Sequence, residues 1–201
     1  ISMIRVGRQF DFGTIQAFYL PYFRERNFAG EGGRLRSGLP VEEEFDNIRV
    51  DGGVFAPSFA LRYDGVFGGA DVGLSAFHGV SRDPGFEPII ALPSVPGPAP
   101  QVVGLAPVYD RITQFGFDGQ FTEDATLYKA EAIFRTGQTN LGGVEEDYVG
   151  VTGGIEHTLY QVFDNADLGL IAEYAYDSRG RDATTTFNND IILGARLALN
   201  D

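Results

Sequence analysis

Apolar and polar residues alternate at every second position through most of this sequence. In 186–199, apolar side chains recur from Ile191 to Leu199, whereas Asp190 and Arg196 have the opposite parity. Because successive side chains of a strand point to opposite faces, this period predicts β-strands with one apolar face. The pattern places strands at about 4–22, 50–63, 70–80, 108–122, 125–136, 146–160, 166–177 and 186–199.

Short and long connections between these strands follow one another in turn. Tight turns are predicted at 64–69, at 123–124 and around Asp164–Asn165, where Gly, Asp and Asn suit hairpins. The long polar or Pro/Gly-rich connections are 24–49, 81–108, 137–146 and 178–187. This rhythm predicts an all-β, antiparallel up-and-down sheet, and no break in composition divides residues 1–201 into more than one domain.

The apolar faces distinguish two classes of β protein. A soluble sandwich has short strands and a richly polar outer face. Here the strands are long, their apolar faces lack central charges, and the opposite faces hold Gly, Ala, Thr and a few charges. This combination predicts a transmembrane β-barrel, with a soluble all-β fold as the alternative. The aromatic residues expected at its interfaces are Tyr19, Tyr22, Tyr63, Phe67, Phe121, Tyr160, Phe163, Tyr174 and Tyr176.

Three segments carry a resemblance to a known group of proteins. Pro21–Phe28, Phe77–Pro84 and Leu170–Tyr174 resemble segments of uncharacterised Gram-negative outer-membrane β-barrel proteins of porin-like appearance. The resemblance covers most of the chain and implies the fold and a bacterial outer-membrane location. It implies no substrate and no catalytic residue. The proteins that it resembles are longer, which fits either a compact relative or an excerpt.

The number of strands has two interpretations. If 4–22 is one strand, eight strands can close a small barrel with short periplasmic turns, long extracellular loops and both termini on the periplasmic side. If a turn lies at Asp11–Gly13, there are nine strands in an open part of a larger barrel. The end of the chain leaves both open, because Gly194–Leu199 resembles an outer-membrane assembly signal but Asn200–Asp201 follows it.

The composition limits the kinds of binding and catalysis that the chain can carry out. Asp and Glu total 28 against 15 Lys and Arg, a net charge of −13, which argues against nucleic-acid binding. The chain has no Cys and two His, so disulfides and thiolate chemistry are excluded, and we expect neither a metal nor a cofactor. No run of about 18 apolar residues predicts a transmembrane helix.

Charged residues of the strands fall on one parity, the one expected to face the barrel interior. They would line a weakly cation-preferring channel, or, in an eight-stranded barrel, form a salt-bridged plug that fills the interior. These residues are Arg62, Asp118, Lys129, Glu131, Arg135, Glu156, Glu173, Asp177, Asp190 and Arg196.

The long connections supply candidate binding residues. Residues 84–107 hold seven of the ten prolines, so we expect a loop that either constricts the mouth or meets a partner. In the first long connection, Arg24, Arg26, Arg34 and Arg36 can bind lipopolysaccharide phosphates. Glu42–Glu44 and Asp46 can hold divalent cations. The alternative is that these charges are simply solvated.

Catalysis has little support in the sequence. His78 and His157 fall on the apolar parity near opposite ends of their strands, and neither has a serine of the same parity nearby. We therefore expect no enzyme, and porin-like passive passage of small solutes or ions as the function. The alternative is a non-conducting barrel that presents its loops to lipopolysaccharide or a protein. Expected partners are outer-membrane lipid and lipopolysaccharide, with a protein partner or a homo-oligomer as a further option, and no nucleic acid.

Overall fold

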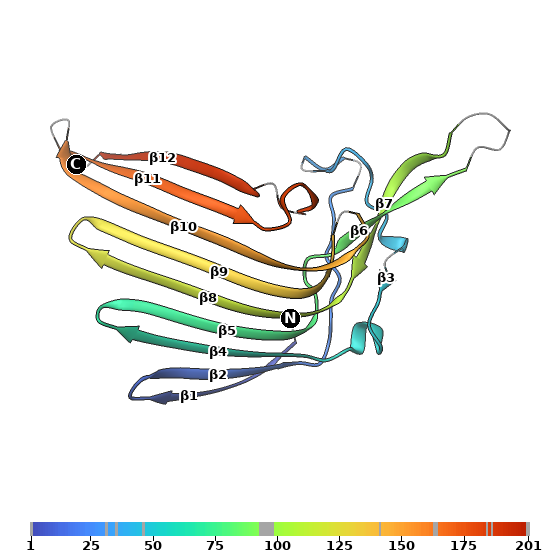
Figure 1. Cartoon of the computed structure of the whole chain (residues 1–201), viewed down its shortest axis with the longest axis horizontal. Helices are drawn as coiled ribbons and strands as arrows, with labels where there is room; N and C mark the ends of the chain where they lie inside the picture. Colours follow the sequence, from blue (N-terminus) through green and yellow to red (C-terminus); the bar gives the residue numbers. More distant parts are fainter. Residues whose placement is uncertain are drawn as a thin grey trace.

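The computed structural model describes residues 2–30, 32–34, 36–45, 47–92, 99–140, 142–162, 165–183, 185 and 187–199 (Figure 1). Within these residues nine strands form one antiparallel sheet, in which each strand pairs with the sheet strand that precedes it in the chain. In sheet order they are β1 (Ile4–Phe10), β2 (Gly13–Leu20), β4 (Ser58–Phe67), β5 (Ala70–Val80), β8 (Arg111–Glu123), β9 (Thr126–Thr139), β10 (Glu145–Val162), β11 (Ala166–Asp177) and β12 (Asn189–Leu199).

The two ends of this sheet differ, as Figure 1 shows. All the short hairpin turns lie at one end, which we call the turn end, and the long connections lie at the other, the loop end. Gly68 and Gly69 form the β4–β5 turn with φ of 58° and 88°. Such left-handed residues match the twist of a two-residue hairpin. The predicted all-β, antiparallel up-and-down arrangement is confirmed for this sheet.

Of the two strand counts that the sequence allowed, the described residues form nine strands in this sheet and not eight, and they form no closed barrel. Segment 4–22 turns at Asp11–Phe12 into β1 and β2, which brings the described sheet to nine strands, and within that sheet β1 and β12 are the edge strands. Gly13 permits this turn, because its φ is 142° and a Cβ there would lie 2.4 Å from the Asp64 carbonyl oxygen. Both edge strands run from the loop end to the turn end, which puts the termini at opposite ends (Figure 1).

A second, smaller sheet forms at the loop end, where 84–107 was expected to be a loop. β6 (Gly85–Ala91) and β7 (Gln101–Tyr109) make a hairpin, and β3 (Asn47–Ile48) adds to β7 in parallel. Figure 1 shows this hairpin projecting away from the main sheet. Its tip, with Pro93, Pro96 and Pro98, lies outside the described residues.

The strands of this hairpin accept proline because of the direction of their hydrogen bonds. Leu105, opposite Pro88, donates to Pro40 and accepts from Glu42, so its polar groups point away from β6. Pro88 and Pro107 therefore occupy positions where the β6–β7 ladder requires no N–H donor. The sequence prediction failed because it treated every proline as incompatible with a strand.

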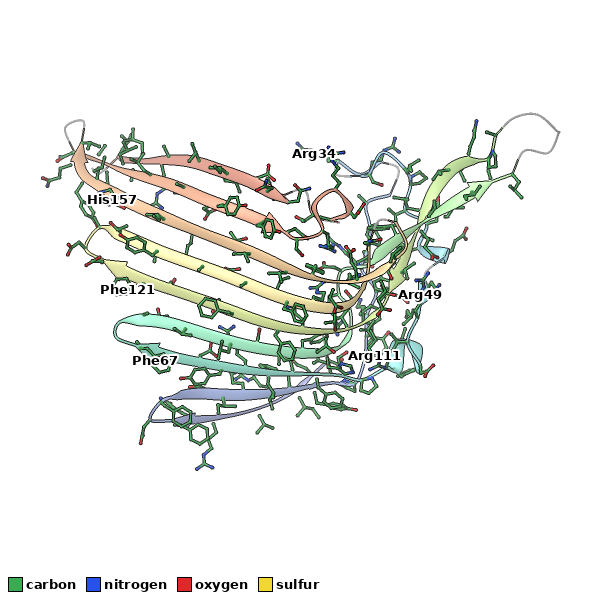
Figure 2. The ribbon with its side chains drawn as sticks, in the orientation of Figure 1. Arg34, Arg49, Phe67, Arg111, Phe121 and His157 are labelled. Atoms are coloured by element: carbon green, nitrogen blue, oxygen red, sulfur yellow. The ribbon has the colours of Figure 1, made fainter. Side chains whose placement is uncertain are left out.

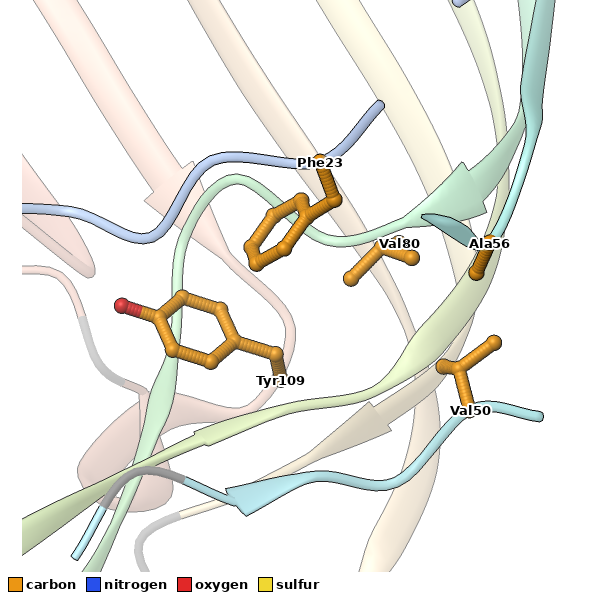
Figure 3. Close-up of a cluster of buried hydrophobic side chains, with 5 residues drawn as sticks. All are labelled: Phe23, Val50, Ala56, Val80 and Tyr109. Carbon is orange, nitrogen blue, oxygen red and sulfur yellow. The ribbon is translucent and has the colours of Figure 1, made fainter. Parts of the chain in front are cut away.

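The buried core lies at the loop end and not beneath the sheet. Phe23, Val50, Ala56, Val80 and Tyr109 pack together there (Figure 3), with the Phe23 and Tyr109 ring centroids 4.9 Å apart. This cluster joins the long connection 21–57, which includes η1 (Glu43–Phe45) and η2 (Gly53–Phe55), to the ends of β5 and β7. A third short 3-10 helix, η3 (Gly180–Asp182), lies between β11 and β12.

Both faces of the main sheet are open. The accessible surface is 13291 Å² for a 21.9 kDa chain, whereas a compact monomer of that mass exposes about 9,300 Å². The excess means that much apolar surface remains without a protein partner. Among the described residues, no helix has the length and apolar character needed to cross a membrane.

Truncating the core should release the connection 21–57 from the sheet. We expect Phe23→Ala to lower the free energy of unfolding by about 3–5 kcal/mol, because a fully buried ring is removed. It should also speed proteolysis within 24–49. Urea unfolding and limited proteolysis measure both effects. Phe55→Ala is the control, because that side chain is 73% exposed and its loss should change little. Equal effects of the two substitutions would contradict this description of the core.

Candidate functional site

One face of the nine-stranded sheet gathers its charged side chains. Directly paired residues in antiparallel strands share a face, and the registers connect Arg62 with Ser75, and Asp118 with Gly73 and Glu131. Followed across all strands, they put every predicted interior charge on this side, which we call the charged face. Its predicted members are Arg62, Asp118, Lys129, Glu131, Arg135, Glu156, Glu173, Asp177, Asp190 and Arg196.

The opposite side, the apolar face, consists mainly of large side chains that are open to the surroundings. The ten side chains named at the end of this paragraph are each between 36% and 76% exposed. A soluble monomer rarely leaves so many large apolar groups contiguous and exposed. They include Leu61, Leu74, Phe115, Phe117, Phe134, Val151, Ile155, Leu170, Leu193 and Leu197.

Arg8 is an exception to the expected absence of central charges on this face. It pairs with Ile15, which in turn pairs with Tyr63, so it lies within the apolar face on edge strand β1. Its guanidinium lies over the Phe10 ring, 5.0 Å from the centroid. The sequence did not reveal this exception, because 4–22 could be read either as one strand or as two with a turn at Asp11–Gly13, and the face of Arg8 depends on which is formed.

Aromatic side chains gather near both ends of the apolar face. Tyr19 and Phe59 lie towards the loop end, with ring centroids 5.3 Å apart. Phe67 and Phe121 lie at the turn end, as Figure 2 shows, and Phe121 is 6.4 Å from the ring of Tyr128. From Phe59 to Phe67 the strand counts nine residues, within the 9–11 of a tilted membrane strand. Phe163, also predicted for these bands, lies outside the described residues.

On the charged face, two ion pairs each span a strand and join the strands on either side of it. Both terminal nitrogens of Arg62 donate to the Asp118 carboxylate, one of them at 2.8 Å, and Arg62 Nε donates to Asp64 at 2.7 Å. Gly73 lies between these groups, and a Cβ there would stand 2.4 Å from Asp118 Oδ2. The glycine thus makes the bidentate contact possible. Lys129 pairs with Glu173 in the same way across β9–β11.

The remaining predicted charges are not joined into one network. Asp177 bonds Arg179, which the sequence analysis did not select, at 2.6 Å and 3.0 Å. Arg135 donates to Gln114 and Gln138. Over the ranges that the structure describes, Glu131, Glu156, Asp190 and Arg196 make no ion pair within 4.0 Å.

Two hollows follow one another along the charged face. One of about 720 Å³ lies towards the turn end, and its lining includes Arg62 and Lys129 against a larger number of carboxylates. The other, of about 600 Å³, lies towards the loop end, where Arg26, Arg135 and Arg179 face an equal number of acids. Glu131 lines both. The charged face is therefore more acidic towards the turn end.

Several polar residues of this face were not among those predicted from the sequence. Asp64 lies on it because β4 continues to Phe67, beyond the predicted end at 63, and Asp71 lies on it at the start of β5, within the predicted strand 70–80. Asp71 accepts a hydrogen bond from Gln120 at 2.9 Å. The alternation itself continues through Gly65 and Phe67, and this signal was obscured by the glycines that suggested a turn.

The four loop arginines do not share one environment. Arg24 and Arg26 line a third hollow, of about 480 Å³, together with Glu43 and Glu44. Arg34, seen at the loop end in Figure 2, and Arg36 are exposed. Asp46 lies outside the described residues. Where the chain is described, no group of three or more His, Asp or Glu side chains is arranged to hold a metal ion.

In the described part of the chain, the hydrogen-bond partner of each histidine is a threonine and not a serine. His78 Nδ1 lies 2.9 Å from Thr113 Oγ1, and His157 Nδ1 lies 2.8 Å from Thr126 Oγ1. Ser58 is buried and accepts a hydrogen bond from the Val80 amide at 3.2 Å. These contacts are ones that stabilise neighbouring strands.

Comparison of the chain with known proteins gives no matching family model, no similar curated protein and no matching solved structure.

The Arg62–Asp118 pair should couple two strands energetically. In a double-mutant cycle with Arg62→Gln and Asp118→Asn, we expect a coupling of about 1 kcal/mol in the free energy of unfolding, because the bidentate pair is partly exposed. Arg62→Gln with Asp71→Asn is the control cycle and should show much less coupling. A coupling near zero for the first cycle would contradict the described contact.

Proposed function

We propose that this chain belongs to a β-barrel of the bacterial outer membrane that allows porin-like, passive passage of small solutes or ions. One observation carries the proposal: nine strands in a single register put the charged side chains on one face and large exposed apolar side chains on the other. In a membrane barrel these are the lumen face and the lipid face.

Lipid is the environment that best suits the apolar face. Each large apolar side chain that leaves water contributes about 1.5–3 kcal/mol. The two aromatic bands, about nine residues apart along β4, have the spacing of membrane interfaces. Arg8, in the same register row as Tyr63 and Leu74, is the exception on this face, and its long side chain can extend along β1 towards the polar headgroups.

The open edges favour the larger of the two barrels that the sequence allowed. β1 and β12 each present a row of backbone donors and acceptors, which cannot remain unpaired in lipid. We therefore propose that the nine strands form an arc of a barrel completed by further strands. A larger barrel leaves a water-filled lumen, whereas eight strands would be filled by side chains.

The charges support a preference for cations. The hollow near the turn end has more carboxylates than basic groups, and Glu131 lies where the two hollows meet. Fixed carboxylates along a narrow path attract cations and repel anions. Passage requires no reaction and no cofactor.

The projecting β6–β7 hairpin supports a second candidate function. A non-conducting barrel would use this hairpin, together with Arg24, Arg26, Arg34 and Arg36, to contact a protein or lipopolysaccharide phosphates. The described part of the hairpin extends outwards, so of the two roles that the sequence left open it suits contact with a partner better than constriction of the mouth.

Introducing a charge on either face tests the membrane assignment. Leu74→Arg, on the apolar face midway between the aromatic bands, should lower the free energy of unfolding from lipid vesicles by about 2–4 kcal/mol. Thr152→Arg is the matched control on the charged face, where its register partner is Glu131, and it should cost markedly less. Similar losses for the two variants would contradict a lipid-facing surface.

Planar-bilayer recordings test the passage of ions. The reconstituted protein should give discrete conductance steps with a modest cation preference, and Glu131→Gln should reduce that preference by removing a carboxylate that has no ion-pair partner within 4.0 Å among the described residues. Glu123→Gln, at the β8–β9 turn, should leave it unchanged. If the reconstituted protein gives no conductance steps, the pore is rejected and the contact role is favoured.

A further inference from the structure

We propose that Arg26 and Arg135 form a binding seat for the carboxylate of a small amphipathic organic anion, and that Asp83 occupies this seat in the free protein. The seat lies at the loop end of the 600 Å³ hollow, which all three residues line. It would lie on the solute path of the proposed pore, but binding to it does not require that the protein conduct.

The three side chains come from separate parts of the chain. Arg26 belongs to the connection 21–57, Asp83 follows β5, and Arg135 lies on β9. Arg26 Nη1 is 3.8 Å from one Asp83 oxygen, and Arg135 Nη1 is 3.8 Å from the other. Both distances exceed those of a direct charge-assisted hydrogen bond, about 2.7–2.9 Å. One carboxylate is thus shared loosely between two guanidinium groups.

Arg135 has no close counter-ion for its charge. Its side chain is only 12% exposed, and its hydrogen bonds go to the neutral amide oxygens of Gln114 and Gln138, at 2.7 Å and 3.2 Å. A buried guanidinium without a close counter-ion retains a strong attraction for an anion. Asp83, whose side chain is 67% exposed, gives up little when it moves aside into water.

The other charges around the hollow are either paired with one another or lie away from the seat. Asp177 bonds Arg179, so that pair contributes no net charge. Arg82, next to Asp83, lies over the Phe23 ring at 5.0 Å, and burial lowers the pKa of its guanidinium without removing its charge at neutral pH. Glu131 also lines the hollow but lies deeper, where the second hollow begins.

The lining selects an anion with an apolar body. Phe86, Ile133 and Phe187 line the same hollow as the two arginines. Phe86 is held in an edge contact with Phe28, with centroids 5.6 Å apart, and Phe187 is 53% exposed. A flat or branched apolar group can cover these side chains while its carboxylate bridges Arg26 and Arg135. Benzoate has this chemistry, and acetate and benzamide each lack one half of it.

Titration calorimetry of the full chain in detergent micelles tests the seat. Benzoate should bind about tenfold more tightly than either acetate or benzamide. Arg135→Gln should weaken benzoate binding about tenfold, and Arg26→Gln should weaken it too. Asp83→Asn should tighten it severalfold, because the competing carboxylate is lost. Arg36→Gln, in the same connection but outside the hollow, is the control and should change nothing.

Two results would overturn the proposal: benzamide binding as tightly as benzoate, or weaker benzoate binding in Asp83→Asn. If Arg135→Gln does not fold, Arg26→Gln and Asp83→Asn still test the seat. Both side chains are mostly exposed, so we expect these two variants to fold. Benzoate binding by a protein that is silent in bilayers would reject the pore and keep the seat. Conductance without benzoate binding would reject the seat and keep the pore.

Discussion

The alternation of side chains across an extended backbone, maintained in one register through nine strands, is the constraint on which the rest of this structure depends. A slip of one residue in any strand would move its charges into the apolar face. The ion pairs Arg62–Asp118 and Lys129–Glu173 form between strands only in this register. They contribute modest energy, since they are partly exposed, but they favour one alignment over its neighbours.

The sequence predicted the parts of the fold that depend on this period. Segments 70–80 and 166–177 coincide with β5 and β11 because their alternation ends at clear turn residues. The positions of the ten charges follow from the same rule, since a face is decided by parity alone. The number of strands could not be predicted in the same way. Whether the chain turns at Asp11–Gly13 depends on contacts with Tyr63 and Asp64 of a neighbouring strand, and the residues around the turn do not reveal those contacts.

The candidate site could be predicted only in part, for a similar reason. Parity placed Arg135 on the charged face but gave no information about Asp83 or Arg26, which reach it from long connections. Their positions depend on the core around Phe23 and Tyr109, where the Arg26 amide also donates to the Tyr109 hydroxyl at 3.0 Å. Contacts between residues 83 positions apart have no periodic signal in the sequence. The hairpin β6–β7 was missed because proline was judged without the hydrogen-bond direction of its partner strand.

The shared direction of β1 and β12 has a consequence for any barrel that contains this sheet. Direct closure of the two edges would join parallel neighbours, because both strands run from the loop end to the turn end. A wall that is antiparallel throughout therefore needs an odd number of further strands between them, which gives an even total of at least ten. A chain segment that supplies an odd number of strands starts at one end of the sheet, the turn end or the loop end, and finishes at the other. A single hairpin has two strands and starts and finishes at the same end, so it cannot complete the barrel.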